Sequence, residues 1–228
     1  MFTPKTLSFL RSLKRNNDRA WFHERRDQYE VHVRGPMIQI VERLAEDLRS
    51  FAPDYDADVK RSLFRPWRDT RFSENKAPLK TIVAARFPNR ALGPQNGAGL
   101  YFEVGPGWVW IGGGAYAPEA PQLYAIREHV AADYRELAKI VGARGFKQFG
   151  GLKGERLTRV PRGFAKDHPA ADYLHYKQFM GIREEAAAFA TGPDFYKELV
   201  RTFKAFVPLC RFLNEPLVAN VKLRPLID

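Results

Sequence analysis

The sequence predicts a single α+β domain, in which a mostly antiparallel sheet of about four to six strands is flanked by N-terminal, central and C-terminal helices. Three observations predict this class. Apolar residues recur at helical spacing near the N-terminus. Short aromatic and β-branched segments bounded by Gly, Pro and Asn then follow. Few helical residues separate those segments, which favours antiparallel pairing.

No repeat or linker divides the 228 residues, so we expect one domain over residues 1–228. Its expected parts are a helical segment over about 1–50, the sheet and a central helix over about 60–185, and a C-terminal helix over about 193–213.

The N-terminal segment has signals for three helices. Thr3-Pro4 is a typical helix start, and Asp18 is a plausible N-cap for a second helix. Gly35-Pro36 should separate that helix from a third. The apolar face of the third helix comprises Met37, Ile40, Val41, Leu44 and Leu48.

Four segments of the next stretch have strand character: SLFRPWRD (62–69), TIVAARFP (81–88), GLYFEVG (99–105) and WVWIGGG (108–114). Pro66 predicts that the first of them is an edge strand or carries a bulge. Gly105-Pro106-Gly107 should join the last two as a hairpin.

The remaining chain predicts two further helices and one strand. Pro118-Glu119 should open a helix over about 119–142, which Gly142 and Gly145 close. Residues 146–175 are irregular and basic, and a strand is expected near YKQFMGIREE (176–185). Gly192-Pro193-Asp194 should start the last helix, which runs to about Leu213.

The net charge of +11 is concentrated in two segments. Residues 60–90 hold nine Lys/Arg against two Asp/Glu, and residues 144–177 hold eight against three. Such clustering can focus an attractive field for anions, although solvated faces that point in unrelated directions would give the same counts.

Compartment and membrane signals are few. The one cysteine, Cys210, allows no intramolecular disulfide, which fits a reducing, cytoplasmic location, and its apolar surroundings favour a buried role. No apolar run approaches the roughly 18 residues of a membrane span, and the N-terminus lacks a secretory signal, so we expect no membrane partner.

The stretch RDTRFSENKAPLKT (68–81) is the most charged part of the chain that adjoins a predicted strand. One interpretation is an ordered loop held by ion pairs, in which a partly buried Asp69 binds a guanidinium. The other is a pocket for phosphate or carboxylate, formed where this stretch meets the second basic segment. Its candidate residues are Arg65, Arg68, Arg71, Lys76, Lys80, Arg162 and Lys166.

Other motifs are weaker. The glycines of IGGGAYAPEAPQ either cradle an anion at a helix N-terminus or let backbones pack closely, and we favour packing. Trp108 and Trp110 share one face of their strand, where packing under a helix is favoured over a stacking platform. The histidines predict no metal site, and no cofactor motif is present. If the site is catalytic, the available acid/base groups are Asp69, Glu103 and His168.

The run Arg68-Asp69-Thr70-Arg71-Phe72-Ser73, followed by Lys76, Pro78 and Lys80, and the Gly112–Gly114 turn resemble a family of bacterial and fungal proteins catalogued as domain of unknown function 2461. The resemblance extends in order over nearly the whole chain. It implies an uncharacterised single-domain protein and brings no established reaction, cofactor or partner.

Two functions therefore stay open, and neither requires a catalysed reaction. The first is a site for a phosphate- or carboxylate-bearing small molecule. The alternative is non-enzymatic binding of nucleic acid or an acidic partner through the same basic segments, although no known nucleic-acid module is present. A concave, partly buried cluster of cations would favour the first, and a flat exposed stripe the second.

Overall fold

A computed structural model, which describes residues 1–93 and 96–223, confirms the α+β class. Its sheet has the strand order β1-β2-β3-β5-β4, and neighbouring strands are antiparallel throughout. The strands are β1 (Val83–Phe87), β2 (Gly99–Val104), β3 (Trp108–Ala115), β4 (Leu152–Lys153) and β5 (Phe179–Ala186).

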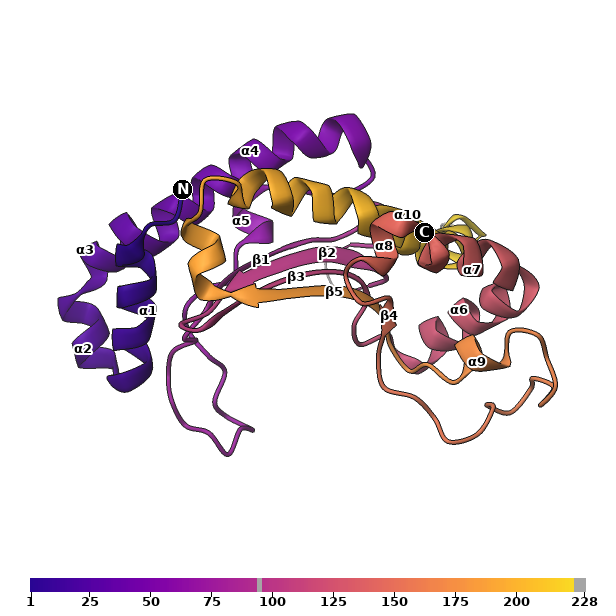
Figure 1. The fold of residues 1–228 in the computed structure, drawn as a ribbon. Helices are drawn as coiled ribbons and strands as arrows, with labels where there is room; N and C mark the ends of the chain where they lie inside the picture. The colour runs from indigo at the N-terminus through magenta and orange to yellow at the C-terminus, as the bar shows by residue number, and fades with distance from the viewer. Residues whose placement is uncertain (94–95, 224–228) are drawn as a thin grey trace.

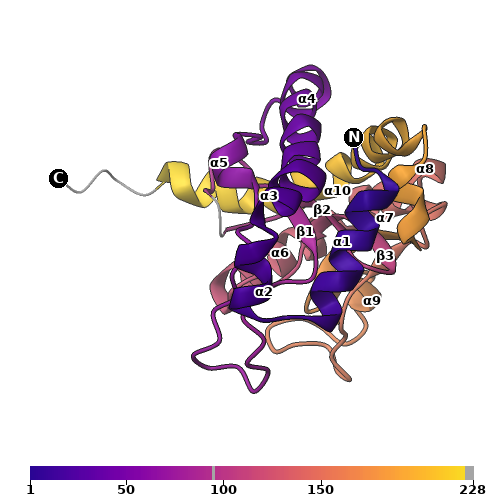
Figure 2. The same ribbon diagram turned by 90° about the vertical axis from the view of Figure 1, so that its left-hand side faces the viewer.

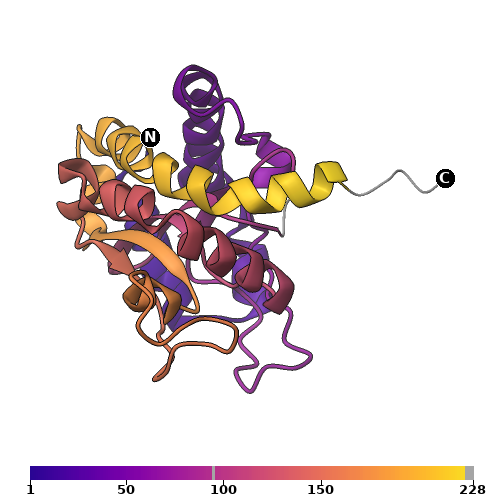
Figure 3. The same ribbon diagram turned by 90° about the vertical axis from the view of Figure 1, so that its right-hand side faces the viewer.

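The helices lie mainly over one face of this sheet and at its two ends (Figure 1). The N-terminal group is α1 (Pro4–Arg15), α2 (Arg19–Glu24), α3 (Arg26–Tyr29), the π-helix η1 (Glu30–Arg34), α4 (Gly35–Phe51) and α5 (Val59–Ser62). The second group is α6 (Ala120–Ala132), α7 (Tyr134–Gly142), α8 (Arg144–Lys147), α9 (Ala171–Leu174), the 3-10 helix η2 (Ala187–Thr191) and α10 (Phe195–Leu223). The helices α4 and α10 cover one face of the sheet, and no helix of residues 1–93 and 96–223 covers the opposite face (Figures 1 and 3).

The N-terminal helices begin where the sequence predicts. Thr3 and Thr6 form a capping box at α1, and the Asp18 carboxylate accepts from the backbone N–H of Trp21 at 2.8 Å. Gly35-Pro36 does not separate two helices, contrary to expectation, because η1 continues directly into α4. Proline inside a continuous helix removes one backbone hydrogen bond, and the π-helical turn η1 lies directly before it.

Residues 62–69 are not a strand, contrary to expectation. The segment leaves α5 and forms two isolated bridges, one from Leu63 to Ala85 of β1 and one from Trp67 to Leu79, which lies outside the sheet. Proline has no N–H to donate, so Pro66 breaks the ladder between these two bridges. The segment therefore borders the edge strand β1 without extending the sheet.

The two remaining long helices differ from expectation in their limits. The predicted 119–142 helix is two helices, α6 and α7, which meet at Asp133. The last helix continues ten residues past the expected end at Leu213, although Pro208 and Pro216 lie inside it. Burial of apolar side chains on its sheet-facing side, Leu209, Leu213 and Leu217, compensates for the backbone hydrogen bonds that the prolines remove.

The glycine triplet lies within β3 rather than at a helix N-terminus, and α6 begins only at Ala120. A Cβ on Gly113 would lie 2.6 Å from the Cβ of Phe206 and 3.2 Å from the Sγ of Cys210. The triplet therefore allows α10 to approach β3 closely, which is the packing interpretation. On the covered face, buried side chains of the sheet, α10 and the N-terminal helices form one continuous hydrophobic cluster.

We predict that Gly113→Ala lowers the free energy of unfolding by about 1–3 kcal/mol, because the added methyl group must displace α10 from the sheet. Gly142→Ala is the matched control, since a Cβ there meets nothing within 4 Å. Its effect should be neutral or slightly stabilising, as alanine is the better helix former. Urea denaturation of both variants measures the difference, and equal stabilities would contradict the close approach of α10.

Candidate anion-binding surface

Residues 68–78 form a loop that projects from the edge of β1, below the sheet in Figure 1. Its base is closed by two backbone hydrogen bonds, from Arg68 N to Pro78 O at 2.9 Å and from Lys80 N to Pro66 O at 2.7 Å. The guanidinium of Arg68 donates into the loop, to Ala77 O at 3.4 Å and to Ser73 Oγ at 3.3 Å. Arg68 is therefore a structural residue of this loop.

Asp69 binds a guanidinium, as predicted. Arg71 donates to its carboxylate at 2.8 and 3.1 Å, and these bonds hold the pKa of Asp69 below its ordinary value. The expected burial is wrong, since 51% of the Asp69 side chain is exposed. Phe72 is itself 96% exposed, and Trp67 packs against Phe22, so neither covers the ion pair. Lys76 also bonds locally, to Thr70 O at 3.1 Å.

The second basic segment does not meet the first. It connects β4 to β5, at the edge of the sheet opposite to β1, and Figure 1 shows the two loops at opposite ends of the uncovered face. Four strand spacings separate these edges, which corresponds to roughly 19 Å. Arg162 and Lys166 are exposed in this segment. The two segments therefore flank one face and form no common pocket, contrary to expectation.

The three candidate acid/base groups also lie apart. Glu103 is buried on the uncovered face, where its carboxylate accepts from Trp108 Nε1 at 2.7 Å and from the hydroxyl of Tyr101. Burial and the bond to Glu103 raise the pKa of Tyr101 well above its ordinary value, so Tyr101 stays a neutral donor. His168 lies in the second basic segment, and its Nδ1 accepts from Ala170 N at 3.0 Å.

Trp108 and Trp110 face the uncovered side of the sheet, and not a helix as expected. Val109 and Ile111 alternate with them and are buried under α10. Trp110 is 41% exposed. The uncovered face is therefore an aromatic surface, to which β2 adds Tyr101.

A cluster of cations borders this aromatic surface, and we call Arg65, Lys80 and Arg86 the open-face cluster. Two of its members lie at the ring of Phe64: Lys80 Nζ is 4.9 Å and Arg86 Cζ 5.6 Å from the ring centroid. Phe64 in turn lies 6.0 Å from Tyr101. Burial, and then the charge of Arg65, lower the pKa of Lys80.

In the described part of the chain, no carboxylate lies within ion-pair distance of the open-face cluster; Glu103, on the same face of the neighbouring strand, is bonded to Tyr101 and Trp108. Among the ion pairs of the described residues, none includes Arg65, Lys80 or Arg86. Asp69 lowers the local potential only from a distance, as its own partner is Arg71. The half-buried Lys80 and Arg86 and the exposed Arg65 thus lie near one another without an ion-pair partner, and their mutual repulsion is unfavourable in the absence of an anion.

Sequence reasoning missed Arg86, although a signal for it exists. In the segment VAARF, Arg86 alternates with the buried Ala85 and Phe87, so strand periodicity places its side chain on the opposite face. The pairing register then sets Arg86 directly beside Tyr101 on β2.

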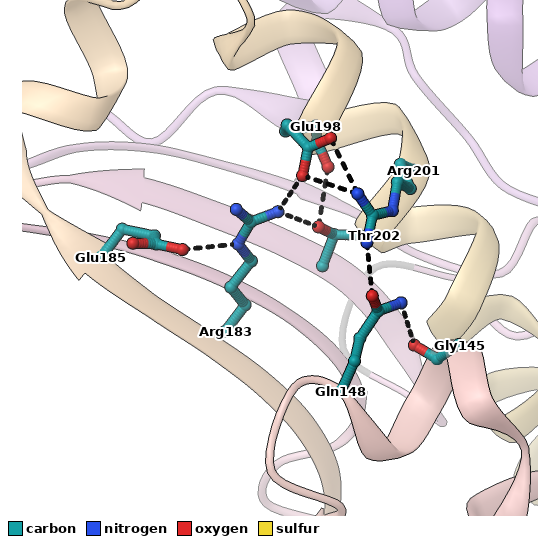
Figure 4. Close-up of polar contacts among 7 residues, drawn as sticks. All are labelled: Gly145, Gln148, Arg183, Glu185, Glu198, Arg201 and Thr202. Atoms are coloured by element: carbon teal, nitrogen blue, oxygen red, sulfur yellow. Dashed lines mark hydrogen bonds and ion pairs between the residues drawn. The ribbon is translucent and has the colours of Figure 1, made fainter.

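A second polar cluster, the Arg183 network, lies between β5 and α10 (Figure 4). The guanidinium of Arg183 donates to Glu198 at 2.8 Å, Glu185 at 2.9 Å and Thr202 at 3.1 Å, and its side chain is only 12% exposed. The rings of Phe149 and Phe189 lie 5.2 and 4.7 Å from it. Its charge is thus fully compensated, which distinguishes it from the open-face cluster.

We predict that Arg183→Met lowers the free energy of unfolding by about 3 kcal/mol, because it leaves Glu198 poorly compensated between helix and sheet. Hydrogen bonding by Arg183 holds the pKa of Glu198 below its ordinary value. That stabilisation is fully present above the pKa of an unfolded glutamate, about 4.3, and is lost as the pH falls through the lower pKa of Glu198 in the folded protein. Acid should therefore destabilise the wild type more than Arg183→Met. Asp69→Ala, at an exposed ion pair, is the comparison and should hardly change the urea midpoint. Equal losses at both positions would contradict the difference in burial.

Comparisons with known proteins complete the description of this surface. Among the described residues, no helix is long and apolar enough to cross a membrane, and no three His, Cys, Asp or Glu residues are grouped to hold a metal ion. No curated protein and no solved structure matches the chain. A family described as "Conserved hypothetical protein (DUF2461)" matches residues 5–212, which include the charged loop, the sheet and most of α10. The chain therefore belongs to the DUF2461 family.

Proposed function

We propose that the protein binds a phosphate- or carboxylate-bearing small molecule on the uncovered face of the sheet, through Arg65, Lys80 and Arg86. The observation that carries the proposal is the placement of Lys80 and Arg86 at the Phe64 ring, with Arg65 close enough to affect Lys80 and, among the described residues, no carboxylate in ion-pair distance. Burial and then repulsion by Arg65 lower the pKa of Lys80, and a bound anion would offset both. The guanidinium of Arg86 would supply paired donors, and Lys80 a compact point charge.

The aromatic side chains beside the cluster support a ligand with a planar or sugar portion. Phe64 and Tyr101 lie next to the cations, and Trp110 is the exposed aromatic residue of the neighbouring strand. An aromatic floor with a few convergent polar groups is the usual composition of a small-molecule site.

The proposal includes no reaction. Asp69 lies in the projecting loop and His168 at the far end of the face, while two donors already occupy Glu103. We therefore propose binding, with Glu103 as the one acid/base candidate near the cluster. The cytoplasmic location stays a prediction.

The exposed cations of the two loops favour a second candidate, the binding of single-stranded nucleic acid. Arg71 and Lys76 are exposed on one loop, and Arg162 and Lys166 on the other. Both loops extend on the uncovered side of the sheet (Figures 1 and 2), and the exposed Trp110 of β3 faces that side. Basic walls beside exposed aromatic rings suit a sequence-tolerant strand of nucleic acid. Such binding would weaken steeply with salt.

We expect phosphate- and carboxylate-bearing compounds at a hundred times their Kd to raise the Tm by about 5–10 °C, because they stabilise the folded state by about 2.7 kcal/mol. Lys80→Gln/Arg86→Gln should abolish the shift. Arg71→Gln/Lys76→Gln is the matched control, with the same change of charge on the adjoining loop, and should retain it.

A panel of such compounds without any shift at millimolar concentration would contradict the proposal. Salt-sensitive oligonucleotide binding that is lost in Arg71→Gln/Lys76→Gln and kept in Lys80→Gln/Arg86→Gln would favour nucleic acid instead.

A second prediction concerns pH. Because burial and Arg65 lower the pKa of Lys80, binding of a ligand of constant charge such as sulfate should weaken as the pH rises, at values below the ordinary lysine pKa of about 10.4. Lys80→Arg should remove this dependence, since arginine stays charged. Arg65→Gln should move the loss to higher pH by removing the neighbouring charge. Calorimetric titration across the pH range measures all three, and identical profiles would exclude Lys80 from the site.

A further inference from the structure

A second concentration of cations lines an open cavity between α4 and the first half of α10, in the helical layer on the covered side of the sheet (Figure 1). Its volume is about 640 Å³, which lies in the range of small-molecule sites. Four cationic side chains line it against a single carboxylate. They are Arg43, Lys197, Arg201 and Lys204, and the carboxylate is that of Asp47.

Helical spacing produces this arrangement. Lys197, Arg201 and Lys204 are separated by four and three residues, so their side chains share one side of α10. Leu199 and Phe203 occupy the other side of the helix and are fully buried. No sequence signal relates this basic side to α4; the packing of α4 against α10 brings Arg43 and Asp47 to it.

The one carboxylate of the cavity already has a partner. Asp47 accepts from the hydroxyl of Tyr196 at 2.5 Å, and Tyr196 forms a buried part of the wall. Burial and the bond to Asp47 raise the pKa of Tyr196, so the wall stays neutral there. Glu46 also lies close enough to influence Tyr196, but it does not line the cavity.

Three of the four cations have no such partner. Arg201 is held by Glu198 at 3.1 Å and by Gln148 (Figure 4). Arg43 stacks on the ring of Tyr196, with its Cζ 3.9 Å from the centroid, which leaves the edge of its guanidinium free to donate. In the described part of the chain, neither Arg43, Lys197 nor Lys204 takes part in a side-chain hydrogen bond or ion pair.

We propose that this cavity is a second anion site, which binds a small molecule with two or more phosphate or carboxylate groups. Lys197 and Lys204 are seven residues apart, which is about 10.5 Å along the helix axis, so a ligand whose anionic groups are spread over a comparable distance matches them best. A ligand with several anionic groups can contact both and place another beside Arg43. The site is independent of the open-face cluster, since the two lie on opposite sides of the sheet.

Calorimetric titration with tripolyphosphate and with citrate at low ionic strength tests the site. We expect Arg43→Gln/Lys197→Gln/Lys204→Gln to bind at least one of these compounds about a hundredfold more weakly than the wild type, because close cation–anion contacts are removed. The control Arg26→Gln/Arg49→Gln/Arg135→Gln removes the same charge from exposed positions outside the cavity and should bind as the wild type does. Circular dichroism checks that both variants fold.

Asp47→Asn provides a test of opposite sign. It removes the single carboxylate of the cavity while an amide oxygen can still accept from Tyr196, so binding should tighten by about threefold to tenfold. Absence of wild-type binding at millimolar concentration would overturn the proposal, as would equal weakening in the control. Binding lost in Lys80→Gln/Arg86→Gln but kept in the cavity variant would assign the compounds to the open face. That result would leave the proposed function intact and overturn the second site.

Discussion

The packing of α10 on one face of the sheet is the contact on which the rest of the structure depends. Gly113 lets the helix backbone approach β3, and Phe203 and Phe206 fill the space on either side. Phe203 reaches across to Phe87 and Phe102, with centroids 5.6 and 6.4 Å away, so one helix joins three strands. A helix with two internal prolines is retained there because burial of its apolar side outweighs the lost hydrogen bonds.

That one-sided covering decides where ligands have access. Antiparallel sheets can leave one face to solvent, and here the free face has Tyr101 and Trp110 in place of a helix-covered core. The two basic segments, residues 60–90 and 144–177, adjoin opposite edges of the sheet. Each edge of the free face therefore has a basic loop beside it. The two basic segments, which suggested a single pocket, therefore border the same face of the sheet from its two edges.

The three clusters of cations described above differ in whether carboxylates pair with them. Arg183, between helix and sheet, is surrounded by carboxylates, a hydroxyl and two aromatic rings, as a buried charge requires. In the open-face cluster and the cavity beside α4, by contrast, every cation except Arg201 is without an ion pair in the described part of the chain. Uncompensated cations at such places are what anion binding needs, whereas Arg183 serves the stability of the fold.

The sequence by itself determined the fold class, most helix starts and the β2–β3 hairpin, because caps, apolar periodicity and turn glycines act within a few residues. It also predicted that Asp69 binds a guanidinium, which Arg71 supplies from two residues away. It did not determine which cations converge: Arg86 reaches Lys80 only through Phe64, and Arg43 meets Lys197 only where α4 packs on α10. Likewise, Pro66 limited residues 62–69 to isolated bridges, and the sheet order set the two basic loops apart. These outcomes belong to tertiary structure, since they depend on contacts between segments far apart in the chain, and local periodicity contains no information about such contacts.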